Sequence, residues 1–577
     1  MMDKYKYCNS LAKYSRRISS EVTIGDIPLG ANNPIRIQSM TTTNTMDTKA
    51  TVNQSIRMID AGCEYVRITA PSRREANNLY EIKNMLVRKG YKTPLIADIH
   101  FTPNAAEIAA RIVEKVRINP GNFADKKKFN FIEYSDQDYQ DEIDRIYDRF
   151  SPLVKVCKEY GTAMRIGTNH GSLSDRILSR YGDTPLGMVE SAMEFLRICE
   201  DHKYFNLVLS MKSSNPIIMV QAYRLLVNKM DLEGMNYPLH LGVTEAGDGE
   251  DGRIKSALGI GTLLDDGLGD TIRVSLTEDP EFELPVAKLL VSYYEGEIVD
   301  KNIGSKNIDF NPFEYNRRPS KSILNIGCEN VPRIIIDLSD NKINNENCLK
   351  RISYNYDSKN DKWDIGDLAC DYIYIGKHNI EFSLPGTIGV IQDYEKWEDK
   401  DQFYPIIDKG IYLSNLKLHS KLNFLSIEIN DLCDQLISKV KDDPTIVLIA
   451  SSDRKHSRRY LRELFFILRH KECSAPVIIS NTYNNKEEEF QVYASIDVGG
   501  LLLDGMGDGV FFRSNMISHE VVNKKSFSIL QATRTRISKT EYISCPSCGR
   551  TLFDLQETTA RIRSKTEHLK GIKIGIM

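Results

Sequence analysis

Short runs of apolar and β-branched residues alternate with longer amphipathic segments along the first half of the chain. The longer segments, such as 50–61 and 188–201, repeat their apolar residues every three to four positions, which is typical of helices. The short runs are typical of buried strands, and there are eight of them: Ile35–Ser39, Tyr65–Thr69, Leu95–Ile99, Val116–Asn119, Ala163–Gly167, Leu207–Met211, Leu239–Val243 and Thr271–Ser275. Eight strand–helix units in about 250 residues predict a TIM barrel, with an irregular insertion around Phe123–Phe150.

The alternation of strands and helices returns in the second half, after a change of composition. From about Glu297 the chain is rich in Asn, Lys, Asp and Ser, and 302–316 is typical of a linker. Beyond it we expect a helix at His456–His470. The expected strands are Arg333–Leu338, Tyr372–Ile375, Ile388–Gln392, Ile411–Ser414, Leu425–Ile429, Ile446–Ala450, Val477–Ser480 and Gly500–Leu503.

One stretch of the first half is repeated in the second. LLDDGLGDTIRVSL at 263–276 corresponds to LLLDGMGDGVFFRS at 501–514, with Asp-Gly-x-Gly-Asp at the same place in both. Self-similarity of this kind indicates a duplication. The expected strand ends of the second copy carry one cation, Lys377. The other residues there are uncharged: Ser339, Gln392, Ser414, Asn430, Ser451 and Ser480. We therefore expect a structural spacer rather than a second catalytic site.

The remaining C-terminal segment predicts a small third domain. We expect a helix at Phe527–Arg536, a basic helix at Phe553–His568 and strands at Tyr542–Ser544 and Ile572–Met577. The predicted fold class is α/β: a TIM barrel, a second, degenerate barrel-like domain and a small, incomplete C-terminal domain. The expected domain boundaries are 1–296, 297–515 and 516–577.

The overall charge of the chain does not favour any one class of binding partner. The 577 residues include 76 Lys and Arg against 79 Asp and Glu, which does not favour nucleic acid or an anionic membrane as a general partner. The 11 cysteines are scattered singly except for one pair, which is typical of a reducing compartment. No run reaches the roughly 18 apolar residues of a membrane span, and no signal or transit peptide is recognisable. We expect a bacterial cytoplasmic protein.

Cations gather at the expected C-terminal ends of the barrel strands, where TIM barrels build their active sites. Several buried like charges are costly unless a polyanion compensates them, and the arginine fork suits phosphate oxygens. A substrate with at least two phosphates is therefore predicted, although pairing with acids such as Asp98 or Glu245 is the structural alternative. The candidate residues are Arg67, Arg117, Asn119, Arg165, Asn169, Lys212, Arg273 and Ser275.

Three groups at the same strand ends could move or hold protons. Asp98 and His100 end the third strand in LIADIH, and Glu245 follows the seventh in HLGVTEAG. A carboxyl near cations normally has a lowered pKa, so Glu245 would need burial or a transient partner to act as an acid. A salt bridge is the alternative for Glu245, and a hydrogen-bonded core position is the alternative for His100.

The paired cysteines, Cys545 and Cys548, stand in SCPSCGR near the end of the sequence. Two thiolates at this spacing can hold one edge of a metal or iron–sulfur centre but cannot complete it. A zinc ribbon would need a second pair, and a thioredoxin motif would need its own βαβ domain. An iron–sulfur cluster fits best, with further ligands expected beyond Met577.

Taken together, these motifs resemble the GcpE/IspG family of 4-hydroxy-3-methylbut-2-enyl diphosphate synthases, in its long three-domain form. The resemblance extends over both ends of the chain. It rests on QSMTTTNTMDT (38–48), ADIHFTPNAA (97–106), VRINPGN (116–122), MRIGTNHGSL (164–173), PLHLGVTEAG (238–247), GDTIRVSL (269–276) and SCPSCGR (544–550).

The resemblance implies reductive ring opening of 2-C-methyl-D-erythritol 2,4-cyclodiphosphate, with loss of water, in the non-mevalonate isoprenoid pathway. Two electrons would come from ferredoxin or flavodoxin through a [4Fe-4S] cluster held by Cys545 and Cys548. Glu245 would be the acid/base group. The diphosphate would be bound by the basic strand ends, with Asp98 and His100 beside them.

One departure from the family pattern concerns the cluster. Family members continue past the segment matching Ile572–Met577 with a Gly-Cys segment and a Glu, which supply the remaining ligands, and this sequence contains neither. We expect a truncated but otherwise sound enzyme, either a monomer or a homodimer. The alternatives are a cluster-deficient diphosphate-binding protein and a pterin-type barrel synthase.

Overall fold

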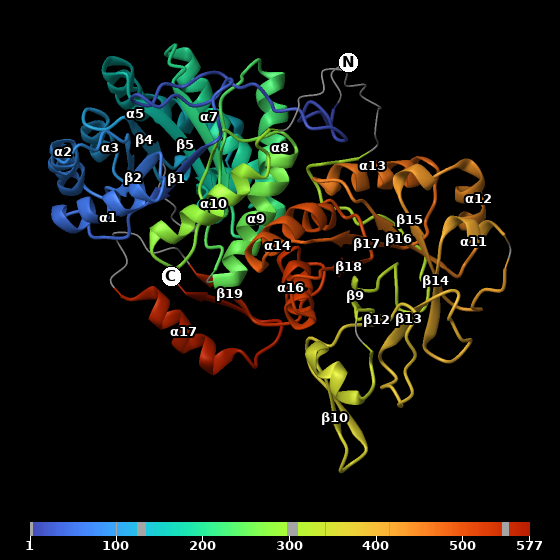
Figure 1. Ribbon diagram of the computed structural model, residues 1–577. Helices are drawn as coiled ribbons and strands as arrows, with labels where there is room; N and C mark the ends of the chain where they lie inside the picture. Colours follow the sequence, from blue (N-terminus) through green and yellow to red (C-terminus); the bar gives the residue numbers. More distant parts are fainter. Residues whose placement is uncertain are drawn as a thin grey trace.

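The computed structural model describes residues 4–99, 101–123, 134–247, 249–296, 310–340, 342–414, 416–544 and 553–576. It contains two parallel barrels side by side and a small C-terminal module below the first (Figure 1). No helix in these ranges is long and apolar enough to cross a membrane.

The first barrel is an eight-stranded parallel sheet, as predicted. Its strand order is β6-β5-β4-β3-β2-β1-β8-β7, and Leu239, just before β7, pairs with Leu209 of β6 to join the two ends. The strands are β1 (Arg36–Met40), β2 (Tyr65–Thr69), β3 (Leu95–Asp98), β4 (Lys115–Ile118), β5 (Ala163–Asn169), β6 (Leu207–Lys212), β7 (His240–Leu241) and β8 (Thr271–Ile272).

Helices cover the outside of this barrel, because their apolar faces pack on strands that are buried on both sides. Asp47 and Ser72 cap the first two helices with their side-chain oxygens. The helices are α1 (Thr48–Asp60), α2 (Arg73–Arg88), α3 (Pro103–Ala110), α4 (Pro120–Phe123), α5 (Asp136–Tyr160), α6 (Asp175–Tyr181), α7 (Pro185–Asp201), α8 (Pro216–Leu232), α9 (Gly249–Asp265), η1 (Pro280–Phe282) and α10 (Glu283–Ser292).

An insertion does follow the fourth strand, but the prediction that it is irregular is wrong over Asp136–Phe150. Residues 124–133 lie outside the described part, but α5 begins at Asp136 and runs through the rest of the predicted insertion. Ser135 and Asp138 form a reciprocal capping box that starts the helix. The many charged residues of its first half are the solvent face of a helix, not a sign of irregular structure.

The second half closes into a barrel of its own, with the order β12-β13-β14-β15-β16-β17-β18-β9. A short antiparallel hairpin, β10–β11, projects from it (Figure 1). The strands are β9 (Arg333–Asp337), β10 (Tyr354–Asp357), β11 (Lys362–Ile365), β12 (Tyr372–Tyr374), β13 (Gly389–Asp393), β14 (Phe403–Ile407), β15 (Asn423–Ile427), β16 (Ile446–Ser451), β17 (Val477–Thr482) and β18 (Gly509–Arg513).

The helical segments of the second half include α13 at Ser457–His470, as predicted. Together they are η2 (Glu346–Ile352), α11 (Lys409–Leu413), η3 (Ile429–Asp431), α12 (Asp434–Asp442), α13, α14 (Glu487–Ala494), the π-helical turn η4 (Ser495–Gly499), α15 (Gly500–Leu503) and α16 (His519–Ala532).

Two predicted strands of this half are wrong. Ile411–Ser414 lies in and just after α11, which Asp408 caps, and the fourth strand is instead β14. Gly500–Leu503 is α15, and the last strand is β18. Both segments are short apolar runs, which periodicity alone cannot assign to strand or buried helix.

Matching contacts in the two barrels support the duplication and extend it to the N-terminus. Arg17 donates its backbone N–H to the Gly267 carbonyl at 2.8 Å, and Arg318 donates to Gly505 at 2.8 Å. These residues belong to YSRRIS (14–19) and YNRRPS (315–320). Equivalent contacts join Arg16 and Ser19 to Asp270, and Arg317 and Ser320 to Asp508.

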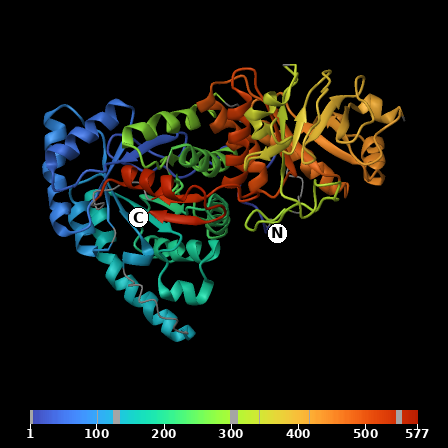
Figure 2. The ribbon, with the colours of Figure 1, turned by 90° about the horizontal axis from the view of Figure 1, so that it is seen from below.

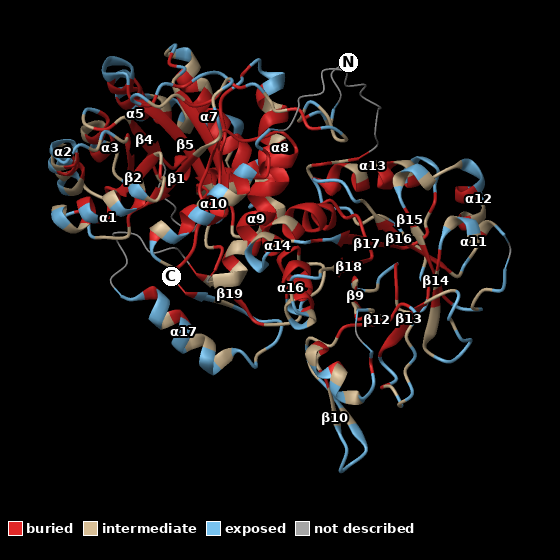
Figure 3. Cartoon of the chain, in the orientation of Figure 1, coloured by how far each residue is buried: buried red, intermediate tan, exposed pale blue. Residues whose placement is uncertain are grey.

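The two barrels meet at a buried interface built from α8, α9 and α10 on one side and α13, α14, η4, α15 and α16 on the other (Figure 3). Arg224 on α8 pairs with Asp266 at 2.8 Å and with Asp504 at 2.6 Å. Arg458 on α13 reaches the same two carboxylates at 3.1 and 2.9 Å. Charges buried this completely must stay paired, so this network fixes how the barrels sit together.

The C-terminal module contains a parallel pair of strands, β19 (Glu541–Ser544) and β20 (Lys573–Ile576), joined through α17 (Leu555–Thr566). Tyr542, Leu555 and Ile576 form its small core. Seen from below, the module (red) lies across the first barrel rather than the second (Figure 2).

Candidate functional site

Five cationic side chains meet in the interior of the first barrel at the C-terminal ends of its strands. They come from five different strands or the residues just after them, and each is between 1% and 7% exposed. The alternation of side chains along each strand turns them inward. They are Arg67 (β2), Arg117 (β4), Arg165 (β5), Lys212 (β6) and Arg273, which follows β8.

Asp98, at the end of β3, lies between two of these arginines. Its carboxylate is 3.3 Å from Arg67 and 3.1 Å from Arg117. Arg117 also donates to the Gly167 carbonyl at 2.9 Å and to Asn169 Oδ1 at 3.3 Å. Asp98 thus orients Arg67 and Arg117. For these two arginines, the pairing with an acid that the sequence left open as an alternative is present.

Arg273 is held by an acid that sequence reasoning missed. Glu283, at the start of α10, accepts from Arg273 Nη2 at 3.1 Å and from Ser39 Oγ at 2.5 Å. Glu283 lies outside the strand ends, so only the tertiary fold brings it to the mouth. Arg273 approaches Met40 Sδ, which also accepts from Arg67 Nε at 3.0 Å.

Arg165 and Lys212 differ from these three, since no described acid forms a salt bridge with either. Burial first, and then the charges of Arg67 and Arg117, hold the pKa of Arg165 well below its usual range. Burial and the surrounding arginines lower the pKa of Lys212 in the same way. Five cations face two contacting carboxylates, so the described site has an excess positive charge that an anion would neutralise.

Polar atoms without hydrogen-bond partners point to the same conclusion. Within the described residues, Arg165 Nε and Nη1, Asn119 Oδ1 and both amide atoms of Gln38 are buried and unpartnered. Buried polar groups are normally satisfied, so a cluster of such atoms is typical of a ligand site. Sequence reasoning did not select Gln38, although it begins one of the family motifs. Ser275, two residues after Arg273 and also beyond the end of β8, is buried.

Glu245 lies in the loop between β7 and α9. Its φ of +53° is the left-handed conformation, which costs a residue with a side chain about 1–2 kcal/mol and must be held by its surroundings. Burial raises the pKa of the half-buried Glu245 carboxyl. A carboxyl with a raised pKa keeps its proton to higher pH, which is what a proton donor needs.

His100, Cys545 and Cys548 lie outside the described residues. Within the described ranges no cluster of three or more His, Cys, Asp or Glu side chains could hold a metal ion. The cysteine pair follows directly after β19, whose last residue is Ser544.

The second barrel fills the equivalent positions with apolar and aromatic side chains. The strand registers and the internal repeat place Tyr374 where the first barrel has Arg67, and Phe511 where it has Arg273. The two rings pack edge to face at 5.8 Å. This interior has no counterpart to those two arginines, as expected for a spacer.

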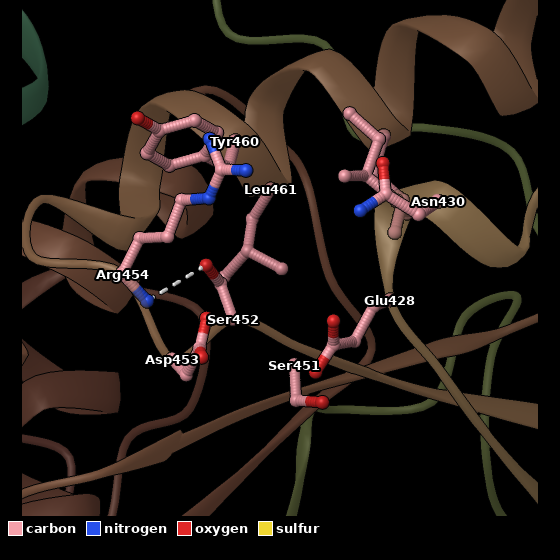
Figure 4. Close-up of a pocket in the computed structure, with 10 residues that line it drawn as sticks. Glu428, Asn430, Ser451, Ser452, Asp453, Arg454, Tyr460 and Leu461 are labelled. Atoms are coloured by element: carbon pink, nitrogen blue, oxygen red, sulfur yellow. Dashed lines mark hydrogen bonds between the residues drawn. The ribbon is translucent and has the colours of Figure 1, made fainter.

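A separate cavity of about 360 Å³ opens at the ends of β15 and β16 beside α13 (Figure 4). Glu428, Asp453 and Arg454 line it together with Asn430 and Tyr460. Arg454 lies over the Tyr460 ring at 4.5 Å. With two carboxylates and one guanidinium among its lining residues, this cavity does not suit a diphosphate.

Known proteins of one family are similar to this chain over nearly its whole length. The family model of the GcpE TIM-barrel domain matches residues 19–288. The 4-hydroxy-3-methylbut-2-en-1-yl diphosphate synthase (flavodoxin) of Parabacteroides distasonis is 49% identical, over 98% of this chain and 90% of that protein. The corresponding enzyme of Leptospira interrogans is 46% identical, over 99% and 90%.

A plant relative gives the same result. The chloroplastic 4-hydroxy-3-methylbut-2-en-1-yl diphosphate synthase (ferredoxin) of Oryza sativa subsp. japonica is 43% identical, over all of this chain and 82% of that protein. Identity at this level over nearly the whole chain extends through both barrels and the C-terminal module. The chain therefore belongs to the GcpE/IspG family of 4-hydroxy-3-methylbut-2-en-1-yl diphosphate synthases.

Proposed function

We propose that the chain catalyses the reductive ring opening of 2-C-methyl-D-erythritol 2,4-cyclodiphosphate to 4-hydroxy-3-methylbut-2-enyl diphosphate, with loss of water. The observation that carries this proposal is the buried cationic set in the mouth of the first barrel, with its excess positive charge. A cyclic diphosphate is compact and carries negative charge that would compensate this excess. The reaction of the family needs a site of this kind.

The cationic residues would bind and orient the substrate. Arg165 has free N–H groups for phosphate oxygens, and Arg67 and Arg117 are already held in place by Asp98. A preorganised set of donors loses little entropy on binding and fixes the reacting carbons relative to Glu245. Lys212, Arg273 and the polar side chains Asn119, Asn169 and Ser275 complete the proposed binding site, with His100 beside it.

Glu245 would hold the proton that the departing oxygen needs when water is lost. Its raised pKa, which results from burial, favours the protonated form that this step requires. Because neighbouring cations would favour the ionised form, the position of Glu245 in a loop beside rather than within the cationic set suits the role.

Cys545 and Cys548 would be two of the ligands of a [4Fe-4S] cluster. The thiolate pair fits the chemistry of such a group, and β19 brings the chain to the loop of Glu245 immediately before the pair. When bound, the cluster would relay the two electrons of the reduction from an external donor. We infer a flavodoxin or ferredoxin donor, as in the names of the relatives.

We assign these roles to three domains. Residues 1–296 would be the catalytic barrel and 297–515 the spacer, to which α16 also belongs because it packs on β9 and β18. The rest of 516–577 would be the cluster domain. The aromatic interior of the second barrel and the location of the C-terminal module on the first support this division of roles.

Anaerobic expression and cluster reconstitution of the full chain test the proposal. We expect dithionite to drive conversion of the cyclodiphosphate to the open diphosphate, and Glu245→Gln to bind substrate but turn over at least about 100-fold more slowly. Iron and sulfide analysis of the same samples shows whether a slow variant has lost its cluster or only the Glu245 carboxyl. If Glu245→Gln turns over as fast as the wild type, Glu245 is not the acid/base group.

A further inference from the structure

The C-terminal module touches the loop that carries Glu245. Gly247, two residues after Glu245, is buried with a φ of +103°, and a Cβ there would lie 3.0 Å from the Tyr542 carbonyl oxygen. Tyr542 belongs to β19. Glycine at this position therefore allows the backbone of β19 to approach the backbone of the loop.

Ionic contacts secure β19 next to this loop. Asp251, in the first turn of α9, accepts from Lys539 Nζ at 2.6 Å. Lys539 lies two residues before β19 and also donates to Ser528 Oγ of α16 at 3.2 Å. Lys255, one turn further along α9, donates to Glu541 Oε1 at 2.8 Å, and both side chains are nearly buried. Arg563 of α17 also approaches Asp251, at 3.7 Å.

The start of α9 is also tied to the last helix of the second barrel. Glu250 lies 3.1 Å from both Lys524 and Lys525 of α16, and Ser528 donates to it at 3.0 Å. These cations lower the pKa of Glu250 to about 2, although burial acts in the opposite direction. The first turn of α9 thus lies within six residues of Glu245, and both the C-terminal module and α16 hold it in place.

Glu245 needs such support, because a non-glycine residue keeps a left-handed backbone only where its surroundings impose it. On the strand side, Thr244 donates its N–H to the Ser213 carbonyl at 3.2 Å. On the helix side, the fixed points are the contacts of Gly247 and Asp251 with the C-terminal module.

We propose that the contact between Asp251 and Lys539 is a positioning device, which couples docking of the C-terminal module to the active conformation of Glu245. Asp251 and Lys539 touch no reacting atom and act through the loop 243–247. The inference rests on the proposed role of Glu245, but its structural part can be tested without turnover. The consequence of the coupling is that Glu245 takes its active conformation only when the C-terminal module is docked.

Hydrogen exchange of the 577-residue chain, followed by mass spectrometry of peptides that cover 243–247, tests the coupling. The variants are Asp251→Asn, which removes the charge, and Asp251→Glu, which keeps it. Asp434→Asn is a matched control, since Asp434 also lies in the first turn of a helix and pairs with a lysine, Lys471, at 2.7 Å. Thermal unfolding of each variant shows whether it is folded.

We expect Asp251→Asn to exchange about tenfold faster at 243–247, with Asp251→Glu and Asp434→Asn close to the wild type. In the reconstituted enzyme, Asp251→Asn should lower kcat about tenfold while KM changes less than about twofold, because the contact acts on the catalytic group and not on the phosphates.

Three results would overturn the proposal. They are wild-type exchange at 243–247 in Asp251→Asn, equally fast exchange in Asp251→Glu, or a change confined to KM. If the wild type itself does not open the cyclodiphosphate, the proposed function fails, whereas the exchange comparison still decides the coupling of module and loop.

Discussion

Arg224 of the first barrel and Asp504 of the second form a buried ion pair 2.6 Å long, with both side chains no more than 3% exposed. Arg224 simultaneously binds Asp266, which the internal repeat aligns with Asp504. One guanidinium thus joins two equivalent carboxylates from the two copies of the duplicated barrel.

Replacing Arg224 with Met should therefore destabilise the whole chain. Two carboxylates would lose a buried partner, and breaking a buried pair costs about 3–5 kcal/mol. Urea unfolding, followed by circular dichroism, measures the free energy of unfolding. Lys377→Met is the control, because its pair with Glu395 is exposed. A loss below about 1 kcal/mol for Arg224→Met would show that the network does not hold the barrels together.

Arg165→Met should separate binding from stability. Removing a buried cation that lacks a described acidic partner relieves repulsion, so the free energy of unfolding should stay level or rise. Affinity for the cyclodiphosphate should fall by about 1.5–3 kcal/mol, the value of a charge-assisted hydrogen bond. Calorimetry measures the affinity.

Arg117→Ala should reduce affinity by about the same amount but should also destabilise the protein, because Asp98 loses one of its partners. Equal stability changes in the Arg165 and Arg117 variants would contradict the different pairing of these two arginines.

The duplication predicts parallel effects at two glycines. Gly267 and Gly505 have φ values of +78° and +73°, and a Cβ at either would lie 2.2 Å from a backbone carbonyl oxygen, that of Ser15 or Asn316. Gly267→Ala and Gly505→Ala should each cost more than about 1 kcal/mol. Thermal unfolding checks this, and a neutral effect at either glycine would mean that the two turns are not equivalent.

A buried acid at the barrel interface should make stability depend on pH. Burial raises the pKa of Asp497 from 3.8 to about 7, although Tyr293 and Tyr483 donate to it. Because the folded pKa lies above the unfolded one, the stabilising contribution is complete below pH 3.8 and is lost as pH rises through 7.

Asp497→Asn has no such titration. Between pH 5 and pH 8 the wild type should therefore lose about 2 kcal/mol of stability relative to this variant. Paired denaturation curves at the two pH values measure the difference. A constant difference between the proteins would show that Asp497 does not titrate in this range.

Much of the fold was predictable from the sequence, because strands buried on both faces are continuous apolar runs between polar turns. The two wrongly predicted strands of the second half arose where helices are also apolar. Gly500–Leu503 is buried in the interface of the two barrels, so its helix has no polar face to mark the helical period. The alignment of 501–514 with 263–276 contained the correction, since it pairs 509–513 with the expected strand Thr271–Ser275.

The candidate site was predictable to the extent that it lies at strand ends. Glu283 and Met40 could not be selected, since their contacts with Arg273 and Arg67 depend on packing between distant segments. The N-terminal half of the repeat did leave a signal, in the matching Arg-Arg-x-Ser motifs at 16–19 and 317–320.

The most direct test of the central claim is calorimetric titration of the 577-residue chain with 2-C-methyl-D-erythritol 2,4-cyclodiphosphate under anaerobic conditions. We predict one site per chain, which Arg165→Met weakens and which Tyr374→Phe, in the second barrel, leaves unchanged. Binding that is absent, that occurs twice per chain, or that survives Arg165→Met at full strength would contradict the assignment of the first barrel as the diphosphate site.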